Sequence, residues 1–174
     1  MSRIEFLLFI PLLIYGIALS NLLSQWKRFL DFERWHGPFL LTVVMFTEVA
    51  IWNIYTFLEV FTQRATHPYV SYLADLSAPL MFLLAVNALL PRGDEDHEVD
   101  PQEFASRIRP AYFFMGSFVA LHLLPQFRSD EGELWVRLPA IVLLFATSWF
   151  RKNWLIYVLG AIWVVGLVYR ILEG

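Results

Sequence analysis

The sequence predicts an all-α protein, a polytopic transmembrane helical bundle of about six spans joined by short loops. Hydrophobic residues make up 58% of the 174 residues and charged residues only 17%, whereas soluble domains are roughly 45–50% apolar. The apolar residues come in runs of about 20, which is long enough to cross a hydrocarbon core of roughly 30 Å as a helix. Because these runs are continuous and do not alternate with a period of two, they exclude a transmembrane barrel.

We expect each apolar run to form one helix of a single integral membrane domain that covers residues 1–174. The runs are residues 4–23, 38–62, 69–90, 110–125, 134–150 and 154–172. Most of the tryptophans fall at the ends of these runs, as an interfacial aromatic belt requires. The two exceptions, Trp52 and Trp163, lie in the middle of the second and sixth runs.

Two connecting segments have a recognisable pattern. Residues 25–35 combine bulky apolar and basic residues, so this segment either extends the first helix, lies along the membrane surface, or is an ordinary solvated loop. The acidic loop 92–100 lacks the ligand spacing of an EF-hand and is expected to be a solvated connector. Asp100, Pro101 and Glu103 then match an N-cap, a first-position proline and a third-position glutamate, which predicts a helix opening ahead of the fourth run.

The distribution of Lys and Arg predicts the orientation of the chain. The first, third and fifth connections carry Lys27, Arg28, Arg34, Arg92, Arg107, Arg109, Arg151 and Lys152, and the opposite side carries Arg3, Arg64, Arg128, Arg137 and Arg170. Since the side richer in basic residues faces the cytoplasm, both termini are expected to be non-cytoplasmic. A compact chain with short loops suits a bacterial inner membrane.

Glu48 is the most unusual residue, because it lies near the middle of the second run. A carboxylate at that depth is costly and is by default a candidate functional group. Glu48, Trp52, Tyr55 and Glu59 follow a spacing that places them on one helix face, with Glu59 roughly 16 Å along the helix from Glu48. Such a stripe suits a proton or cation path. In the alternative interpretation, a protonated Glu48 hydrogen-bonds to a neighbouring helix and has no further function.

A second group of ionisable residues is expected near the non-cytoplasmic membrane face. With alternating helix directions, the ends of four runs bring Glu59, Asp75, His122 and Arg137 to a similar depth. They would form a polar layer at the mouth of a path that leads to Glu48 in the middle of the membrane. The alternative is that they reach the interface individually, or that an acid pairs with Arg137 to hold helices together.

Small and amide residues in the runs predict close helix packing. Gly116 with Ala120, and Gly160 with Gly166, allow helices to approach closely. Three asparagines are expected to form hydrogen bonds between helices, and these are Asn21, Asn53 and Asn87.

Several classes of site lack their usual motifs. There is no cysteine, which removes disulfides, thiolate metal sites and cysteine nucleophiles. His122 is the only histidine within a run, so it gives no signal for a haem or a metal, and we expect no cofactor. The net charge of −3 and the absence of a basic patch argue against nucleic acid as a partner.

Three functions therefore remain open. The first is a small transport protein or channel for protons, cations or a small solute, and so short a chain would need a homo-oligomer or a partner membrane subunit to enclose a path in the lipid bilayer. The second is a non-catalytic accessory or assembly subunit of a larger membrane complex. The third is a lipid-modifying membrane enzyme that uses the ionisable layer near the headgroups.

Overall fold

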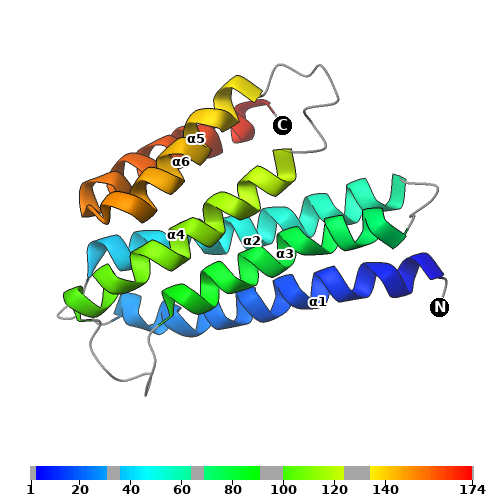
Figure 1. The fold of residues 1–174 in the computed structure, drawn as a ribbon, viewed down its shortest axis with the longest axis horizontal. Coiled ribbons are helices and arrows are strands. Elements are labelled where there is room, and N and C mark those ends of the chain that lie inside the picture. The colour runs from blue at the N-terminus through cyan, green and yellow to red at the C-terminus, as the bar shows by residue number, and fades with distance from the viewer. Residues whose placement is uncertain (1–2, 31–35, 64–68, 91–99, 124–133, 174) are drawn as a thin grey trace.

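The structure, a computed structural model, confirms an all-α bundle. It describes the backbone of residues 3–30, 36–63, 69–90, 100–123 and 134–173. Its elements are α1 (Arg3–Ser24), the 3₁₀ helix η1 (Gln25–Leu30), α2 (Gly37–Gln63), α3 (Tyr69–Leu89), α4 (Pro101–Leu123), α5 (Leu134–Phe150) and α6 (Asn153–Glu173). Figure 1 shows the helices running alternately in opposite directions along one axis. The acidic loop 92–100 lies outside the described residues except for Asp100.

The six helices form a closed ring in which each packs most extensively against two neighbours. α1 lies between α2 and α3, α3 packs on α4, α4 on α5, α5 on α6, and α6 returns to α2. Two of these contacts join helices that are not consecutive in the chain. One is α1 with α3, and the other is between α2 and α6, which are far apart in sequence. α2 and α6 run in the same direction (Figure 1).

Aromatic side chains fill the middle of this ring. Phe46 of α2, Phe82 of α3 and Tyr112 of α4 are at most 2% exposed. The ring of Phe46 lies 6.3 Å from that of Phe82 and 5.9 Å from that of Tyr112, between centroids. The Tyr112 hydroxyl also lies 2.8 Å from Thr42 Oγ1, which links α4 to α2 inside the core. The centre of the bundle is therefore packed with side chains.

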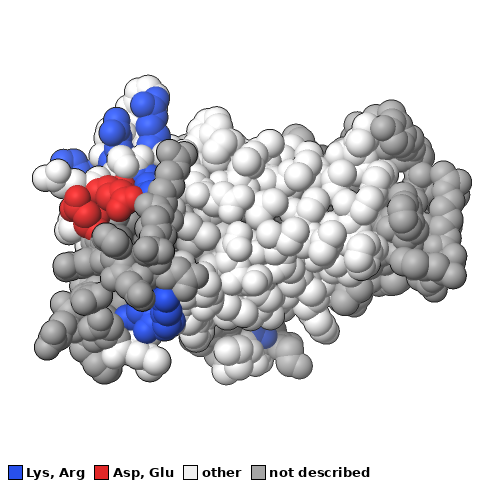
Figure 2. Space-filling view, turned by 90° about the horizontal axis from the view of Figure 1, so that it is seen from below, with Lys and Arg blue, Asp and Glu red and all other residues white. Residues whose placement is uncertain are grey.

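Three segments of the described chain are long and apolar enough to cross a membrane, which supports a membrane protein. They are Phe9–Leu30, Gly37–Thr56 and Asn153–Leu172, and two shorter apolar helices are Leu76–Leu89 and Leu138–Phe150. Figure 2 shows the charged side chains of the described residues gathered mainly at one end of the molecule, beside a broad uncharged surface. An apolar band next to a charged end is the surface expected of a protein in a bilayer.

At the helix ends, the structure favours one of the three alternatives for the segment after the first run, and it confirms the predicted cap of the fourth helix. η1 continues directly from α1, so its residues extend the first helix, and Arg28 Nε donates to Gln25 Oε1 at 2.9 Å. Asp100 caps α4, because the backbone N–H of Gln102 donates to its Oδ1 at 3.0 Å. The fourth helix thus begins well before the apolar run that predicts it.

The predicted close packing is present at two glycines. A Cβ added at Gly116 would lie 3.2 Å from the ring of Phe145, and one at Gly160 would lie 2.7 Å from Leu41 Cδ2. These glycines therefore bring α4 against α5 and α6 against α2. Around Gly166 a Cβ would meet nothing within 4 Å.

The three asparagines form hydrogen bonds of two kinds, between helices and within one helix. Asn21 Nδ2 donates to Asn87 Oδ1 at 3.3 Å, so this pair joins α1 to α3 as predicted. Asn53 Nδ2 donates instead to the Val49 carbonyl of its own helix at 2.7 Å. For Asn53 the observed bond is therefore within α2 and not between helices.

Candidate functional site

The candidate site lies where α2 and α6 meet. Along this parallel pair, Gly37 faces the Tyr157 hydroxyl and Leu41 faces Gly160. Further along the two helices lie Glu48 on α2 and Trp163 on α6, whose side chains meet. The small residue at position 160 lets the helices come close enough for those two side chains to touch.

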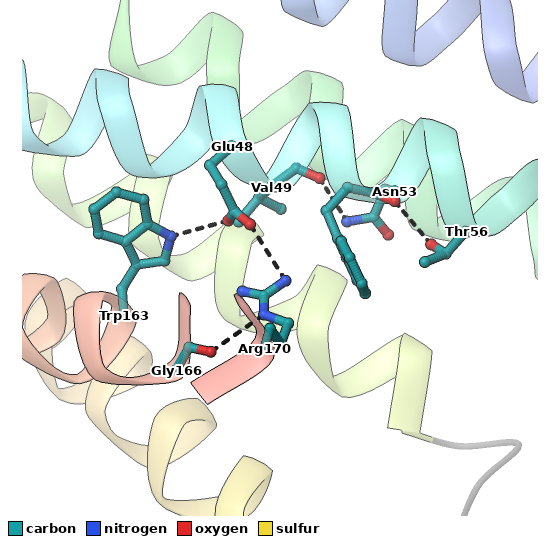
Figure 3. A network of polar contacts seen from close by, with 8 residues as sticks. Glu48, Val49, Asn53, Thr56, Trp163, Gly166 and Arg170 are labelled. Carbon is teal, nitrogen blue, oxygen red and sulfur yellow. Dashed lines mark hydrogen bonds and ion pairs between the residues drawn. The ribbon is translucent and has the colours of Figure 1, made fainter. Parts of the chain in front are cut away.

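Two groups from α6 hold the Glu48 carboxylate. Trp163 Nε1 donates a hydrogen bond to Glu48 Oε2 at 2.9 Å. Arg170 Nη1 lies 3.2 Å from Glu48 Oε1 and forms an ion pair with it. Figure 3 shows both side chains converging on the carboxylate from α6. The Glu48 charge is therefore compensated by one charge and one neutral donor.

Arg170 reaches back along its helix to make this contact. It follows Trp163 by two helical turns, which places its Cα roughly 10 Å further along α6. Helical side chains tilt toward the N-terminus of their helix, so the guanidinium returns to the level of Glu48. Its Nε donates to the Gly166 carbonyl at 3.4 Å, and its Cζ lies 4.6 Å from the centroid of the Trp52 ring. Arg170 thus bridges Glu48 and Trp52 on the same face of α2.

The described part of the predicted stripe, which is Glu48, Trp52 and Tyr55, lies on the outer surface of the bundle. The side chains of Glu48 and Arg170 are 20% and 35% exposed, while Trp52 is 43% and Tyr55 64% exposed. The rings of Trp52 and Tyr55 pack against each other with centroids 6.0 Å apart. The stripe therefore borders the α2–α6 contact and does not face the aromatic core.

Polar groups beside the stripe are satisfied within α2. Asn53 bonds to the Val49 carbonyl, as described above, and Thr56 Oγ1 donates to the Trp52 carbonyl at 2.9 Å (Figure 3). Such back-bonds satisfy a side chain in an apolar environment without another helix. Glu48 differs from them, because its carboxylate is bonded by Trp163 and Arg170 of α6.

The predicted ionisable layer is described only in part. Glu59, Asp75 and Arg137 belong to α2, α3 and α5, and their side chains lie outside the described part of the structure, so the layer stays a prediction. His122 is described, and its Nδ1 lies 3.2 Å from the Phe118 carbonyl oxygen of its own helix. Its ring packs on that of Phe118 with centroids 4.5 Å apart.

Two residues of the site, Trp163 and Arg170, are absent from the predicted set. Arg170 was expected to be one of the basic residues near the membrane surface, and the structure instead directs it to Glu48. A signal was present in the sequence, because the two tryptophans in the middle of runs both belong to this site. Trp163 donates to Glu48, and Trp52 lies beside Arg170.

The site offers one carboxylate, one guanidinium and one indole N–H. Among the residues that the structure describes, no three His, Asp or Glu side chains come together as a metal site would require. The chemistry that this arrangement can perform is the exchange of a proton or a cation at Glu48 against the Arg170 charge. No family model, curated protein or solved structure matches the chain.

Proposed function

We propose that this protein is a small membrane transport protein for protons or cations, with Glu48 as the group that exchanges its charge partner. The observation that carries the proposal is the incomplete burial of the Glu48–Arg170 pair on the outer surface of the bundle. A purely structural ion pair would be expected in the sealed interior between helices, because charge against lipid is costly.

The exposed flank of the pair requires a polar neighbour. Ionisable residues in membrane segments almost always face protein or a water-filled cavity. The middle of the bundle is filled by aromatic rings such as Phe46 and Tyr112, so we place the path at the outer face of α2. A second copy of the chain, or a partner membrane subunit, would close that path along Trp52 and Tyr55.

In this proposal Arg170 acts as the competing charge. When Glu48 takes up a proton or a cation, its attraction to the guanidinium weakens, and Arg170 remains supported by the Trp52 ring and the Gly166 carbonyl. When the ion leaves, the pair forms again. Trp163 keeps the carboxylate at the level of the pair in both conditions.

The proposal also includes the membrane in which the protein lies, its orientation there and the mouth of the path. The protein would lie in a bacterial inner membrane, with the charged end of Figure 2 toward the cytoplasm and both termini on the other side. Glu59, Asp75, His122 and Arg137 would form the outer mouth of the path.

Flux of protons and monovalent cations into liposomes that contain the purified protein tests the proposal. Glu48→Gln keeps the size and a hydrogen-bond acceptor for Trp163 but removes the charge, so flux should be lost while the protein stays inserted. Asp100→Asn, at the exposed start of α4, is the matched control and should conduct as the wild type does. Equal and measurable flux in wild type and Glu48→Gln would refute the role of Glu48 in transport, and absence of flux from both would refute the transport function.

A second candidate function is an accessory subunit of a larger membrane complex. The observation in its favour is the large apolar surface of α6, where Val165, Ile171 and Leu172 are exposed and a partner helix could pack. Here the Glu48–Arg170 pair fixes α6 on α2 and moves no ion. Absence of flux from every variant, together with a stoichiometric partner retained during purification, would favour this function.

A further inference from the structure

A groove between α3 and α4, remote from the Glu48 network, carries an independent inference. Its volume is about 470 Å³, within the roughly 300–1,000 Å³ typical of small-molecule sites. Its walls are formed by Leu84, Asn87 and Ala88 of α3 and by Glu103, Ser106, Arg107, Pro110 and Phe114 of α4.

The groove is polar at one end and apolar at the other. Glu103, Arg107, Pro110 and Phe114 are spaced so that they share one face of α4, and the polar pair comes first along the helix. α3 runs in the opposite direction, so its Asn87 lies beside the polar end and Leu84 further in. α4 starts at the end of the bundle where charged side chains gather (Figure 2). The polar end of the groove is therefore at the level expected for lipid headgroups, and the apolar end points toward acyl chains.

The polar end presents a positive and a negative group side by side. Arg107 Nη2 is bonded to Glu103 Oε1 one helical turn earlier. A guanidinium has five donors and a carboxylate about four acceptor positions, so each group keeps capacity for a ligand beyond this bond. Asn87 uses its Oδ1 to accept from Asn21, which directs its NH₂ donors to other partners. Ser106 donates its hydroxyl hydrogen to the Glu103 carbonyl at 2.7 Å and retains an acceptor.

We propose that this groove binds a zwitterionic phospholipid with a primary ammonium headgroup, of the phosphatidylethanolamine class. Its phosphate would accept hydrogen bonds from Arg107 and Asn87, and its ammonium would donate to the Glu103 carboxylate and Ser106. The acyl chain would lie along Leu84 and Phe114. The pair of opposite charges selects against an anionic headgroup, which Glu103 repels, and a choline headgroup has no N–H to donate.

Native mass spectrometry of the full-length protein in detergent tests the proposal with three lipids of identical acyl chains. The headgroups are ethanolamine, choline and glycerol. Soluble phosphoethanolamine, which has no acyl chains, is tested separately, and its weaker binding measures how much the acyl chains contribute to lipid binding. Wild type should retain the ethanolamine lipid about tenfold better than either other lipid, which is the effect of one charge-assisted contact. Phosphoethanolamine alone should bind much more weakly.

Variants of the polar end should change the retention of each lipid in a specific direction. Glu103→Gln should abolish the preference for ethanolamine over choline and raise retention of the anionic glycerol lipid. The double variant Glu103→Gln with Arg107→Gln avoids an unpaired charge and should lose headgroup discrimination altogether. Lys152→Gln, an exposed charge at the same end of the bundle, should behave as the wild type.

Equal retention of the three lipids by the wild type, or an unchanged preference in Glu103→Gln, would overturn the proposal. So would a groove occupied by a second copy of the chain, which would appear as a dimer that releases no lipid on dissociation. Filling the apolar end with Leu84→Trp should lower retention of all three lipids, and unchanged retention in that variant would also contradict it.

Discussion

Glu48 Oε1 lies 3.2 Å from Arg170 Nη1, so the middle of α2 is joined to the last turns of α6 by an ion pair. This contact lies where α6, the last helix, returns to α2 and closes the ring. Trp163 and Trp52 lie on either side of the pair, one donating to the carboxylate and the other beneath the guanidinium. Its consequences for stability and activity can be measured separately.

Removing one member of the pair should destabilise the protein more than removing both. Arg170→Gln leaves Glu48 without its counter-charge at membrane depth, and we expect a loss of about 1–2 kcal/mol, below the 3–5 kcal/mol typical of fully buried pairs because this pair is partly exposed. The double variant Glu48→Gln with Arg170→Gln should recover much of that loss. The free energy of unfolding in lipid–detergent mixtures measures the cycle, and strictly additive losses would mean that the two residues are not coupled.

A side chain at Gly160 should separate α6 from α2. Gly160→Leu forces its side chain against Leu41, which a Cβ alone would meet at 2.7 Å, and overpacking of this kind costs about 1–3 kcal/mol. Gly160→Ala should cost less, because the end of Leu41 can rotate away. Gly166→Ala is the control, since a Cβ there meets nothing within 4 Å. If both alanine variants and Gly160→Leu unfold like the wild type, α6 does not pack on α2 as described.

The buried hydroxyl pair predicts an unequal effect of two small changes. Thr42 Oγ1 donates to the Pro38 carbonyl at 2.7 Å, so the Tyr112 hydroxyl must be the donor in their mutual 2.8 Å bond. Tyr112→Phe removes that bond while Thr42 stays bonded, at a cost of about 1 kcal/mol. Thr42→Ala leaves the Tyr112 hydroxyl buried without its acceptor and should cost about 1–3 kcal/mol. Thermal unfolding of the two variants side by side checks the order, and the reverse order would show that Tyr112 is not the donor.

His36, just before α2, should make stability depend on pH. Burial lowers the pKa of His36 below its ordinary value, its Nδ1 is buried with no hydrogen-bond partner among the described residues, and its ring packs on Phe104 at 4.8 Å. The unfolded chain binds a proton near pH 6.5, whereas the folded chain resists it. Stability is therefore full above about pH 6.5 and falls as the pH drops through this value toward the folded pKa.

His36→Phe keeps an aromatic ring against Phe104 and removes the titration. Unfolding measured between pH 8 and pH 5 should show a smaller loss of stability for this variant than for the wild type. Identical pH profiles would mean that His36 takes up a proton equally well in the folded and the unfolded chain.

The helices were predictable from the sequence because the need to satisfy the backbone in an apolar environment leaves one solution for each run. The predicted end of the second run at residue 62 and the observed end of α2 at Gln63 differ by one residue. The fourth helix shows the limit of hydropathy. The charged residues Glu103 and Arg107 lie in the helix ahead of the apolar run, and only the Asp100 cap marks the true start.

The partner of Glu48 was not predictable, because a sequence fixes the faces of helices but not their neighbours. Helical spacing correctly places Glu48, Trp52 and Tyr55 on one face, but nothing in the chain order says that α6 lies against that face. Arg170 is near the end of its helix, where basic residues commonly extend to the membrane surface. The position of a small residue, Gly160, decides how closely α6 approaches, and so directs Arg170 to the carboxylate instead.

Cross-linking in native membranes tests the pairing of Glu48 with Arg170 most directly. The chain contains no cysteine, so Glu48→Cys with Arg170→Cys provides two unique thiols for a short bifunctional reagent. Because the two side chains meet in the structure, the intact chain should gain the mass of one linker, and digestion should yield a single peptide pair joining positions 48 and 170. Glu48→Cys with Arg151→Cys, at the charged end of the bundle, should instead gain two singly attached reagents. Two singly attached reagents on the variant with cysteines at positions 48 and 170 would contradict the account, because α6 would then not lie against Glu48.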